Sequence, residues 1–126
     1  MTTDETNDEM AHRPSLLFAE DNKDQLDNYR EFFEDNYRVL CYATVIDTLA
    51  YLARNDVDVI ISDYHLEDGD ADDIFTAANE RGIPSIITSR GKREGVNATH
   101  VLHVLVKPFD LYDLESLIKS CIADEK

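Results

Sequence analysis

Short apolar segments alternate with amphipathic segments of helical period along almost the whole chain, and this alternation constrains the fold more than any other feature. Each apolar segment has the length of one strand, and each amphipathic segment places its apolar residues on one helical face. A helix between successive strands requires the strands to run parallel, in a sheet that helices cover on both faces. We therefore predict an α/β fold with strands at 15–19, 37–43, 58–62, 83–88 and 101–106, and helices at 22–36, 44–55, 70–82 and 110–123.

Residues that favour helix ends stand at the limits of these segments. Asn22, Thr44 and Asp110 come at the starts of helical segments, where a side-chain oxygen can accept hydrogen bonds from free backbone N–H groups. Gly82 ends the third helix, because glycine allows the left-handed conformation in which helices often terminate. The inward faces of the first and last helices are predicted to carry Leu26, Tyr29, Phe33, Leu111, Leu114, Leu117, Ile118 and Cys121.

The chain has the length and composition of a single globular domain. Its 126 residues are 43% hydrophobic, which is enough to bury a core. Residues 1–11 differ from the rest, because they carry four acids, no base and no hydrophobic period, as flexible tails do. We predict a flexible acidic tail over 1–13 and a folded domain over 14–124.

Charge and hydropathy limit the classes of partner. The formal net charge is -15, from 27 acids against 12 bases, so direct binding to nucleic acid or anionic lipid would oppose electrostatic repulsion. No apolar run approaches the roughly 18 residues of a membrane span, and the N-terminus lacks the regions of a signal peptide. We expect a cytoplasmic protein whose partners are proteins or cations, with no membrane insertion. Cys41 and Cys121 are expected to be reduced thiols in or near the core.

Polar side chains stand at the ends of four predicted strands. Glu20 and Asp21 follow the first strand, Asp63 follows the third, Thr88 ends the fourth and Lys107 follows the fifth. The carboxyl ends of parallel strands share one edge of the sheet, which is where α/β proteins bind ligands. We therefore expect these five side chains to converge, with Lys107 at an exposed strand end.

The chemistry of these five residues points to a metal and a phosphoryl group. Close carboxylates repel by about 4 kcal/mol per pair at an effective dielectric constant near 20, and a divalent cation offsets this repulsion. Carboxylate oxygens suit Mg²⁺ better than a softer metal. Lys107 and Thr88 add a cation and a hydroxyl, which can hold a phosphoryl group while an aspartate oxygen attacks it in line. Each residue alone also has a structural explanation as a turn, loop or strand-end residue, but their joint occurrence favours one site.

Five short motifs resemble those of the receiver domains of two-component response regulators. The resemblance covers 15–123 and implies a flavodoxin-like, doubly wound, five-stranded parallel sheet of order 2-1-3-4-5. The motifs are FAED (18–21), ISDYHL (61–66), DGD (68–70), IITS (86–89) and VKPF (106–109).

The resemblance implies a role for each residue at the strand ends. Asp63 is the implied phosphoacceptor, Thr88 and Lys107 contact the phosphoryl oxygens, and Pro108 follows a cis peptide bond. The implied Mg²⁺ ligands are Glu20, Asp21, Asp63 and the backbone carbonyl of His65. The imidazole rings of His12, His65, His100 and His103 are expected to have no chemical role.

The chain departs from the family at four places. Glu67 and Ala71 stand where receivers usually have proline and glycine, which suggests a looser loop, and Val104 replaces the usual tyrosine or phenylalanine. The segment between Thr88 and Lys107 is about three residues shorter than usual, with two glycines and little helical period. We therefore predict a short or absent fourth helix, and the last two features resemble receivers attached to hybrid histidine kinases.

The resemblance implies a phosphoacceptor switch rather than an enzyme. A histidine kinase or a histidine phosphotransfer protein would phosphorylate Asp63 in an Mg²⁺-dependent reaction. No output region follows Ala123, so signalling is expected through contacts with a downstream protein, unless the chain is a fragment. The alternative is a pseudo-receiver that binds a partner without phosphorylation. An aspartyl-phosphate hydrolase would require a second aspartate two residues after Asp63, where this chain has His65.

Overall fold

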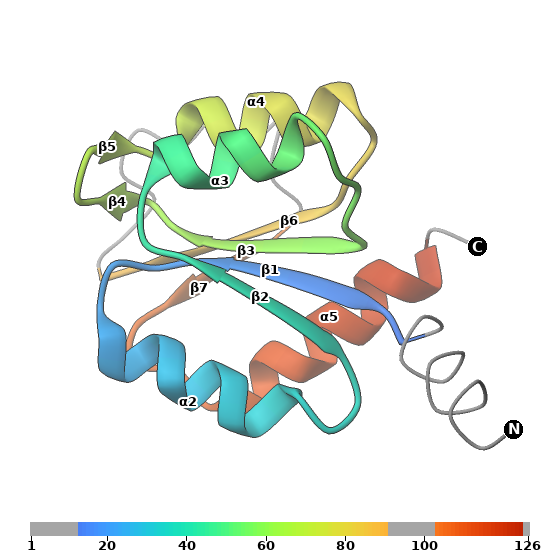
Figure 1. Ribbon diagram of the computed structural model, residues 1–126. Helices are drawn as coiled ribbons and strands as arrows, with labels where there is room; N and C mark the ends of the chain where they lie inside the picture. The colour runs from blue at the N-terminus through green and yellow to red at the C-terminus, as the bar shows by residue number, and fades with distance from the viewer. Residues whose placement is uncertain (1–12, 91–102, 125–126) are drawn as a thin grey trace, which may run out of the picture.

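The computed structural model describes residues 13–90 and 103–124, and its centre is a five-stranded parallel sheet. The strands lie in the order β2-β1-β3-β6-β7, which confirms the predicted order 2-1-3-4-5 (Figure 1). Their bounds are β1 Ser15–Ala19, β2 Arg38–Tyr42, β3 Val59–Asp63, β6 Ser85–Ser89 and β7 His103–Val106.

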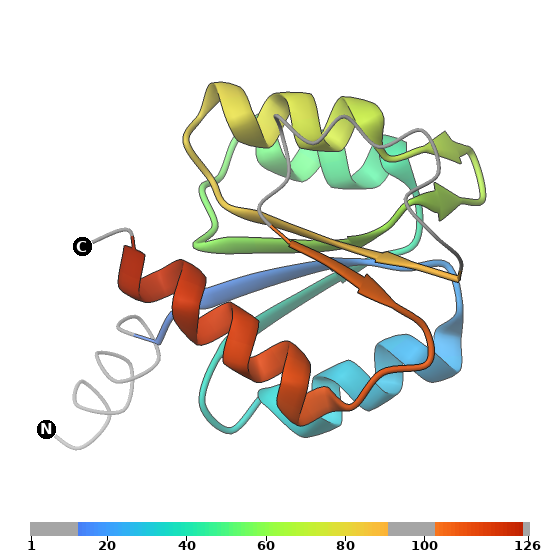
Figure 2. The ribbon, with the colours of Figure 1, turned by 180° about the vertical axis from the view of Figure 1, so that it is seen from behind.

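Helices cover both faces of the sheet, as Figures 1 and 2 show from opposite sides. On one face lie α2 (Lys23–Phe33) and α5 (Leu111–Asp124); on the other lie α3 (Val45–Leu52) and α4 (Asp72–Glu80). Alternate residues of each strand enter different cores, because successive side chains point to opposite faces. On β1, Leu16 and Phe18 pack on the α2/α5 face, whereas Leu17 and Ala19 pack on the α3/α4 face. The predicted doubly wound architecture is therefore confirmed.

Side-chain caps fix the starts of three helices as predicted. Asn22 accepts a hydrogen bond from the backbone N–H of Gln25 at 2.9 Å, and Thr44 accepts one from Asp47 at 3.1 Å. Asp110 accepts one from the N–H of Tyr112 at 2.8 Å. These bonds satisfy N–H groups that have no partner within the helix, so the helix starts follow from local sequence.

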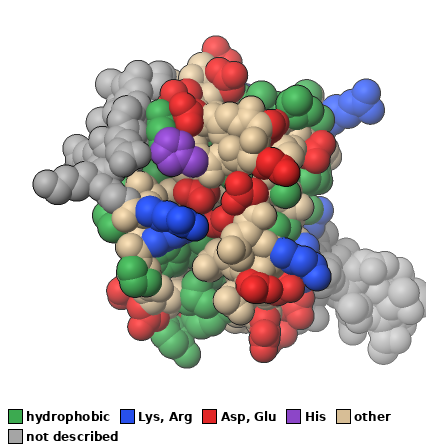
Figure 3. Space-filling model, turned by 90° about the vertical axis from the view of Figure 1, so that its left-hand side faces the viewer, with side chains coloured by type: hydrophobic (Ala, Val, Ile, Leu, Met, Phe, Trp, Pro, Cys, Tyr) green, Lys and Arg blue, Asp and Glu red, His purple; other side chains and the backbone are tan. Residues whose placement is uncertain are grey.

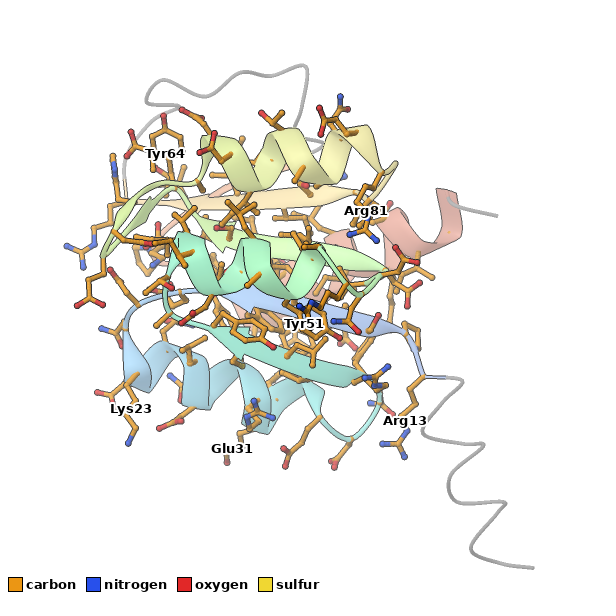
Figure 4. All side chains as sticks on the ribbon, turned by 45° about the horizontal axis from the view of Figure 1, so that its top comes forward. Arg13, Lys23, Glu31, Tyr51, Tyr64 and Arg81 are labelled. Carbon is orange, nitrogen blue, oxygen red and sulfur yellow. The ribbon has the colours of Figure 1, made fainter. Side chains whose placement is uncertain are left out.

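Hydrogen bonds link the C-terminal end of α4 to the last residue of α3 and to the segment that follows it. Gly82 follows α4 with a φ of +70°, the left-handed conformation predicted for it. The guanidinium of Arg81 donates to the backbone carbonyl of Leu52 and to the carboxylate of Asp56. Figure 4 shows the Arg81 side chain at the C-terminal end of α4. The two helices on this face are thus linked by polar contacts as well as by the core.

A small hairpin after β3 differs from the prediction. It pairs β4 (His65–Leu66) with β5 (Gly69–Asp70) in antiparallel register. The predicted helix over 70–82 consequently starts later, at Asp72, because Asp70 belongs to the hairpin. Gly69 has a φ of +145°, a conformation that residues with a side chain rarely adopt. The segment from Glu67 to Ala71 is therefore more regular than the loose loop we expected.

Other expectations have mixed outcomes. Cys41 is half-buried and Cys121 is buried, and neither forms a disulfide bond, as predicted. Among the described helices, none has the length and apolarity needed to cross a membrane. The predicted tail (apart from Arg13) and the fourth helix, which would precede β7, fall in 1–12 and 91–102, outside the described residues.

Candidate functional site

The five side chains predicted to converge lie at the carboxyl edge of the sheet, on the left in Figure 1. Glu20 and Asp21 follow β1, Asp63 ends β3, Thr88 lies in β6, and Lys107 follows β7. Asp63 and Thr88 are paired in register across neighbouring strands. Figure 3 faces this edge and shows acidic side chains gathered at its centre, next to basic ones.

Lys107 links two of the acids. Its Nζ donates to Glu20 Oε1 at 2.8 Å and to Asp63 Oδ2 at 3.2 Å. Burial alone would lower the pKa of Lys107, but the hydrogen bonds and charges of Glu20 and Asp63 outweigh burial and raise it. The Lys107 side chain is only 19% exposed, so the expectation of an exposed strand end was wrong. Its two carboxylate partners draw it inward over the edge of the sheet.

Glu20, Asp21 and Asp63 form an acidic cluster, with one oxygen of each within 4.8 Å of the others. Glu20 is buried and also accepts a hydrogen bond from the Asn22 N–H at 3.1 Å, whereas Asp21 is exposed. Within residues 13–90 and 103–124, no ion pair includes Asp21. Three carboxylates against one ammonium leave excess negative charge, and this all-oxygen donor set fits Mg²⁺.

The hydroxyl of Thr88 is buried beside Asp63 without a hydrogen bond. Thr88 is 1% exposed, and its Oγ1 has no partner among the described residues. Leaving a buried polar group without a hydrogen bond costs about 1 to 3 kcal/mol. Such groups are therefore rare in native domains, and each one calls for an explanation. A ligand oxygen bound at Asp63 would supply the missing acceptor.

The side chain of His65 lies outside the acidic cluster. Its Nδ1 is 3.0 Å from Asp70 Oδ1, across the β4-β5 hairpin. The ring is well exposed and also stacks edge-on against Tyr64. The proposed use of the His65 carbonyl as a metal ligand stays a prediction.

Asp68 has a role that sequence reasoning missed. Its carboxylate accepts hydrogen bonds from the backbone N–H groups of Val45 at 2.7 Å and Ile46 at 3.0 Å. These bonds lower the pKa of Asp68, because they stabilise the ionised form. The DGD motif was interpreted only as a turn and a family marker, and nothing local in the sequence pairs it with residues at the start of α3.

Tyr29 also lies closer to the site than its position on an apolar helix face suggested. Burial raises the pKa of its phenol well above the ordinary value, and the nearby carboxylates of Glu20 and Asp63 raise it further. Helical period correctly predicted that Tyr29 faces inward, but it does not predict where the hydroxyl at the end of the ring lies.

Solved receiver domains share this fold. The signal receiver domain of an HD domain-containing protein from Pseudomonas fluorescens Pf-5 matches with a TM-score of 0.81, covering 90% of this chain and 97% of that chain at 18% identity. The signal receiver domain of a putative Luxo repressor protein from Vibrio parahaemolyticus matches with a TM-score of 0.79, covering 89% and 92% at 23% identity.

A third similar structure was solved in complex with Mg²⁺-BeF. The response regulator protein TrrA from Thermotoga maritima, in complex with Mg²⁺-BeF, matches with a TM-score of 0.77, covering 86% of this chain and 98% of that chain at 14% identity. No family model and no curated protein matches the sequence. The structural likenesses show that the chain has the receiver-domain fold.

Proposed function

We propose that this chain is a phosphoacceptor receiver domain of a two-component system, phosphorylated on Asp63 in an Mg²⁺-dependent reaction. The observation that carries the proposal is the pairing of Lys107 with both Glu20 and Asp63, next to the unsatisfied hydroxyl of Thr88. A nucleophilic carboxylate, a cation and a buried donor at one sheet edge are the parts that phosphoryl transfer requires.

The proposed reaction transfers a phosphoryl group from a phosphohistidine to Asp63. An Asp63 oxygen attacks phosphorus while the bond from phosphorus to the histidine nitrogen breaks, and the leaving imidazole keeps the electron pair and takes a proton from solvent. Lys107 and the Thr88 hydroxyl donate to the phosphoryl oxygens. Mg²⁺ held by Glu20, Asp21, Asp63 and the His65 carbonyl would neutralise part of the charge on the acids and the phosphoryl group.

The access to the site is compatible with a protein donor. An open pocket is lined by Lys107 together with Gln25, Arg90, Pro108 and Phe109, so the lysine of the site borders open space. The donor is a histidine kinase or a histidine phosphotransfer protein, and the output is contact with a downstream protein. The net charge of -15 disfavours direct nucleic-acid output. A cytoplasmic location and a domain spanning 14–124 complete the proposal.

The decisive experiment is intact-mass analysis after incubation with acetyl phosphate, with and without Mg²⁺. We expect one phosphoryl adduct that requires Mg²⁺ and is absent from Asp63→Asn. Asp70→Asn is a matched control, because Asp70 is an exposed acid on the same edge but outside the acidic cluster; it should still form the adduct. No adduct from acetyl phosphate or from kinase donors would favour a module that binds its partner without phosphorylation.

A further inference from the structure

Tyr29 reaches the floor of the candidate site from the α2/α5 face of the sheet. Its side chain is 1% exposed, and its ring stacks on Phe18 with centroids 4.4 Å apart. Phe18 lies on β1 two residues before Glu20, on the same face of the strand. The Tyr29 ring is thereby held beneath the acidic cluster.

Thr88 belongs to the same face. Ile86, two residues earlier on β6, packs in the α2/α5 core, so strand alternation directs Thr88 toward that side as well. The hydroxyl of Tyr29 interacts with the side chains of Thr88 and Gln25 and with the charges of Glu20 and Asp63. Two hydroxyls from different elements therefore lie next to the carboxylate that we propose is phosphorylated.

Both hydroxyls lack a hydrogen bond of normal geometry. Among the described residues, Tyr29 Oη and Thr88 Oγ1 are two of the three buried side-chain polar atoms without a partner; the third is Ser85 Oγ. A hydroxyl has one proton to donate and lone pairs to accept. If Tyr29 donates to Thr88, the proton of Thr88 still requires an acceptor, so the pair alone cannot satisfy both donors.

We infer that Tyr29 is a positioning residue for the phosphoryl group, acting through Thr88. When Asp63 carries a phosphoryl group, Thr88 donates to a phosphoryl oxygen and accepts a hydrogen bond from the Tyr29 hydroxyl. This arrangement satisfies both buried donors and holds Thr88 in the rotamer that binds the phosphoryl group. The inference rests on the proposed function and adds a residue from α2 to the site.

Electrostatics support a donor role for the phenol. Burial and the carboxylates of Glu20 and Asp63 disfavour the phenolate, so the Tyr29 hydroxyl keeps its proton. In the free protein the Tyr29 hydroxyl makes no hydrogen bond of normal geometry with the described residues. Tyr29→Phe should therefore leave the free domain at least as stable, because it deletes a buried unsatisfied group.

The test compares beryllofluoride affinity and aspartyl-phosphate lifetime in the wild type, Tyr29→Phe and Tyr37→Phe, all in Mg²⁺. Tyr37 is the matched control, since it is buried in the same core but its hydroxyl donates to Glu115 at 3.4 Å. Tyr29→Phe should weaken beryllofluoride binding by about 3- to 10-fold, the effect of one neutral hydrogen bond. Tyr37→Phe should bind as the wild type does.

A double-mutant cycle with Thr88→Val separates positioning from general packing. Tyr29→Phe should have little further effect in the Thr88→Val background. In wild type with ¹³C-labelled tyrosine, the ring-carbon resonance assigned to Tyr29 should shift on addition of beryllofluoride, and that shift should be reduced in Thr88→Val.

Two outcomes would overturn the inference in distinguishable ways. If wild type and Tyr29→Phe bind beryllofluoride equally well, Tyr29 does not act through Thr88. The same conclusion holds if Tyr29→Phe weakens beryllofluoride binding by the same factor in the wild-type and Thr88→Val backgrounds. If wild type forms no adduct and binds no beryllofluoride in Mg²⁺, the proposed function fails and the inference fails with it.

Discussion

The carboxylate of Asp68 accepts a hydrogen bond from the backbone N–H of Val45 at 2.7 Å, and so ties the β4-β5 hairpin to the start of α3. The same carboxylate bonds the next N–H, that of Ile46. Thr44 caps α3 through the N–H of Asp47, so the first turn of this helix has one local cap and one long-range cap. The hairpin beside Asp63 is thereby anchored to a helix of the α3/α4 face.

Removing the Asp68 carboxylate should loosen both elements. Asp68→Ala should destabilise the first turn of α3, and Asp68→Asn, which keeps one acceptor oxygen, should have a smaller effect. Because the folded pKa of Asp68 is lowered from 3.8, its stabilisation is present above that value and is lost as pH falls through the lower folded pKa. Urea denaturation near neutral pH and in strong acid should show the difference between wild type and Asp68→Ala only near neutral pH. A difference that persisted in acid would mean that the carboxylate charge is not its cause.

Lys107→Met should lower the stability of the metal-free domain but raise its affinity for Mg²⁺. The variant leaves the buried Glu20 carboxylate with the Asn22 N–H as its one remaining hydrogen-bond donor among the described residues, so the free energy of unfolding without metal should fall by about 1 to 3 kcal/mol. Mg²⁺ affinity should rise by about 10-fold, or about 1.4 kcal/mol, because a competing positive charge is gone. Chemical denaturation and isothermal titration calorimetry measure the two effects. Weaker Mg²⁺ binding in Lys107→Met would contradict the account.

Asp21→Asn should affect metal binding more than folding. Asp21 is exposed and adds a like charge to the acidic cluster, so without metal its loss should leave the melting temperature unchanged or higher. Mg²⁺ should raise the melting temperature of wild type, and this rise should be largely lost in Asp21→Asn. Chelation by EDTA should abolish the rise in every variant. Asp27→Asn is the control, since Asp27 is an exposed acid on α2 outside the acidic cluster. Equal Mg²⁺ responses in the two variants would contradict the proposed ligand set.

Gly69→Ala should strain the hairpin through its backbone alone. An added Cβ would meet nothing within 4 Å, but the φ of +145° is unfavourable for alanine, at a cost of about 1 to 3 kcal/mol. Hydrogen exchange should lose protection over 65–70 more than in the sheet, because Leu66 is the one buried residue of this hairpin. Gly82→Ala, at a φ of +70°, should cost about 1 to 2 kcal/mol and leave the hairpin unaffected. Unchanged exchange over 65–70 in Gly69→Ala would show that the hairpin tolerates another conformation.

Local sequence was sufficient to predict the parallel sheet and most helix starts, whereas the strand order was predicted from the resemblance to receiver domains. Strands buried on both faces appear as continuous apolar runs, and capping residues such as Asn22 and Thr44 act on N–H groups three positions away. The convergence of Glu20, Asp63 and Lys107 also follows from sequence, because parallel strands bring their carboxyl ends to one edge.

The parts that sequence did not predict depend on long-range geometry. Two-residue strands such as β4 and β5 are too short to show a period, and Asp68 finds its partners more than twenty positions earlier in the chain. The inward direction of Tyr29 was predictable, but the place of its hydroxyl depends on how α2 lies on the sheet. The inward position of Lys107 likewise depends on two acids from other strands.

The double pairing of Lys107 with Glu20 and Asp63 makes the lysine an intramolecular competitor for its own site. Before any ligand arrives, the ammonium already serves as the counterion of two carboxylates. An entering cation must take over part of that role, and a phosphoryl group must offer Lys107 an equally good acceptor. The affinity of a ligand for this site therefore reflects the replacement of one set of charge-neutralising contacts by another, rather than binding to an empty site. In the proposed function, phosphorylation of Asp63 would shift this exchange of contacts toward the arrangement in which Lys107 contacts the phosphoryl oxygens.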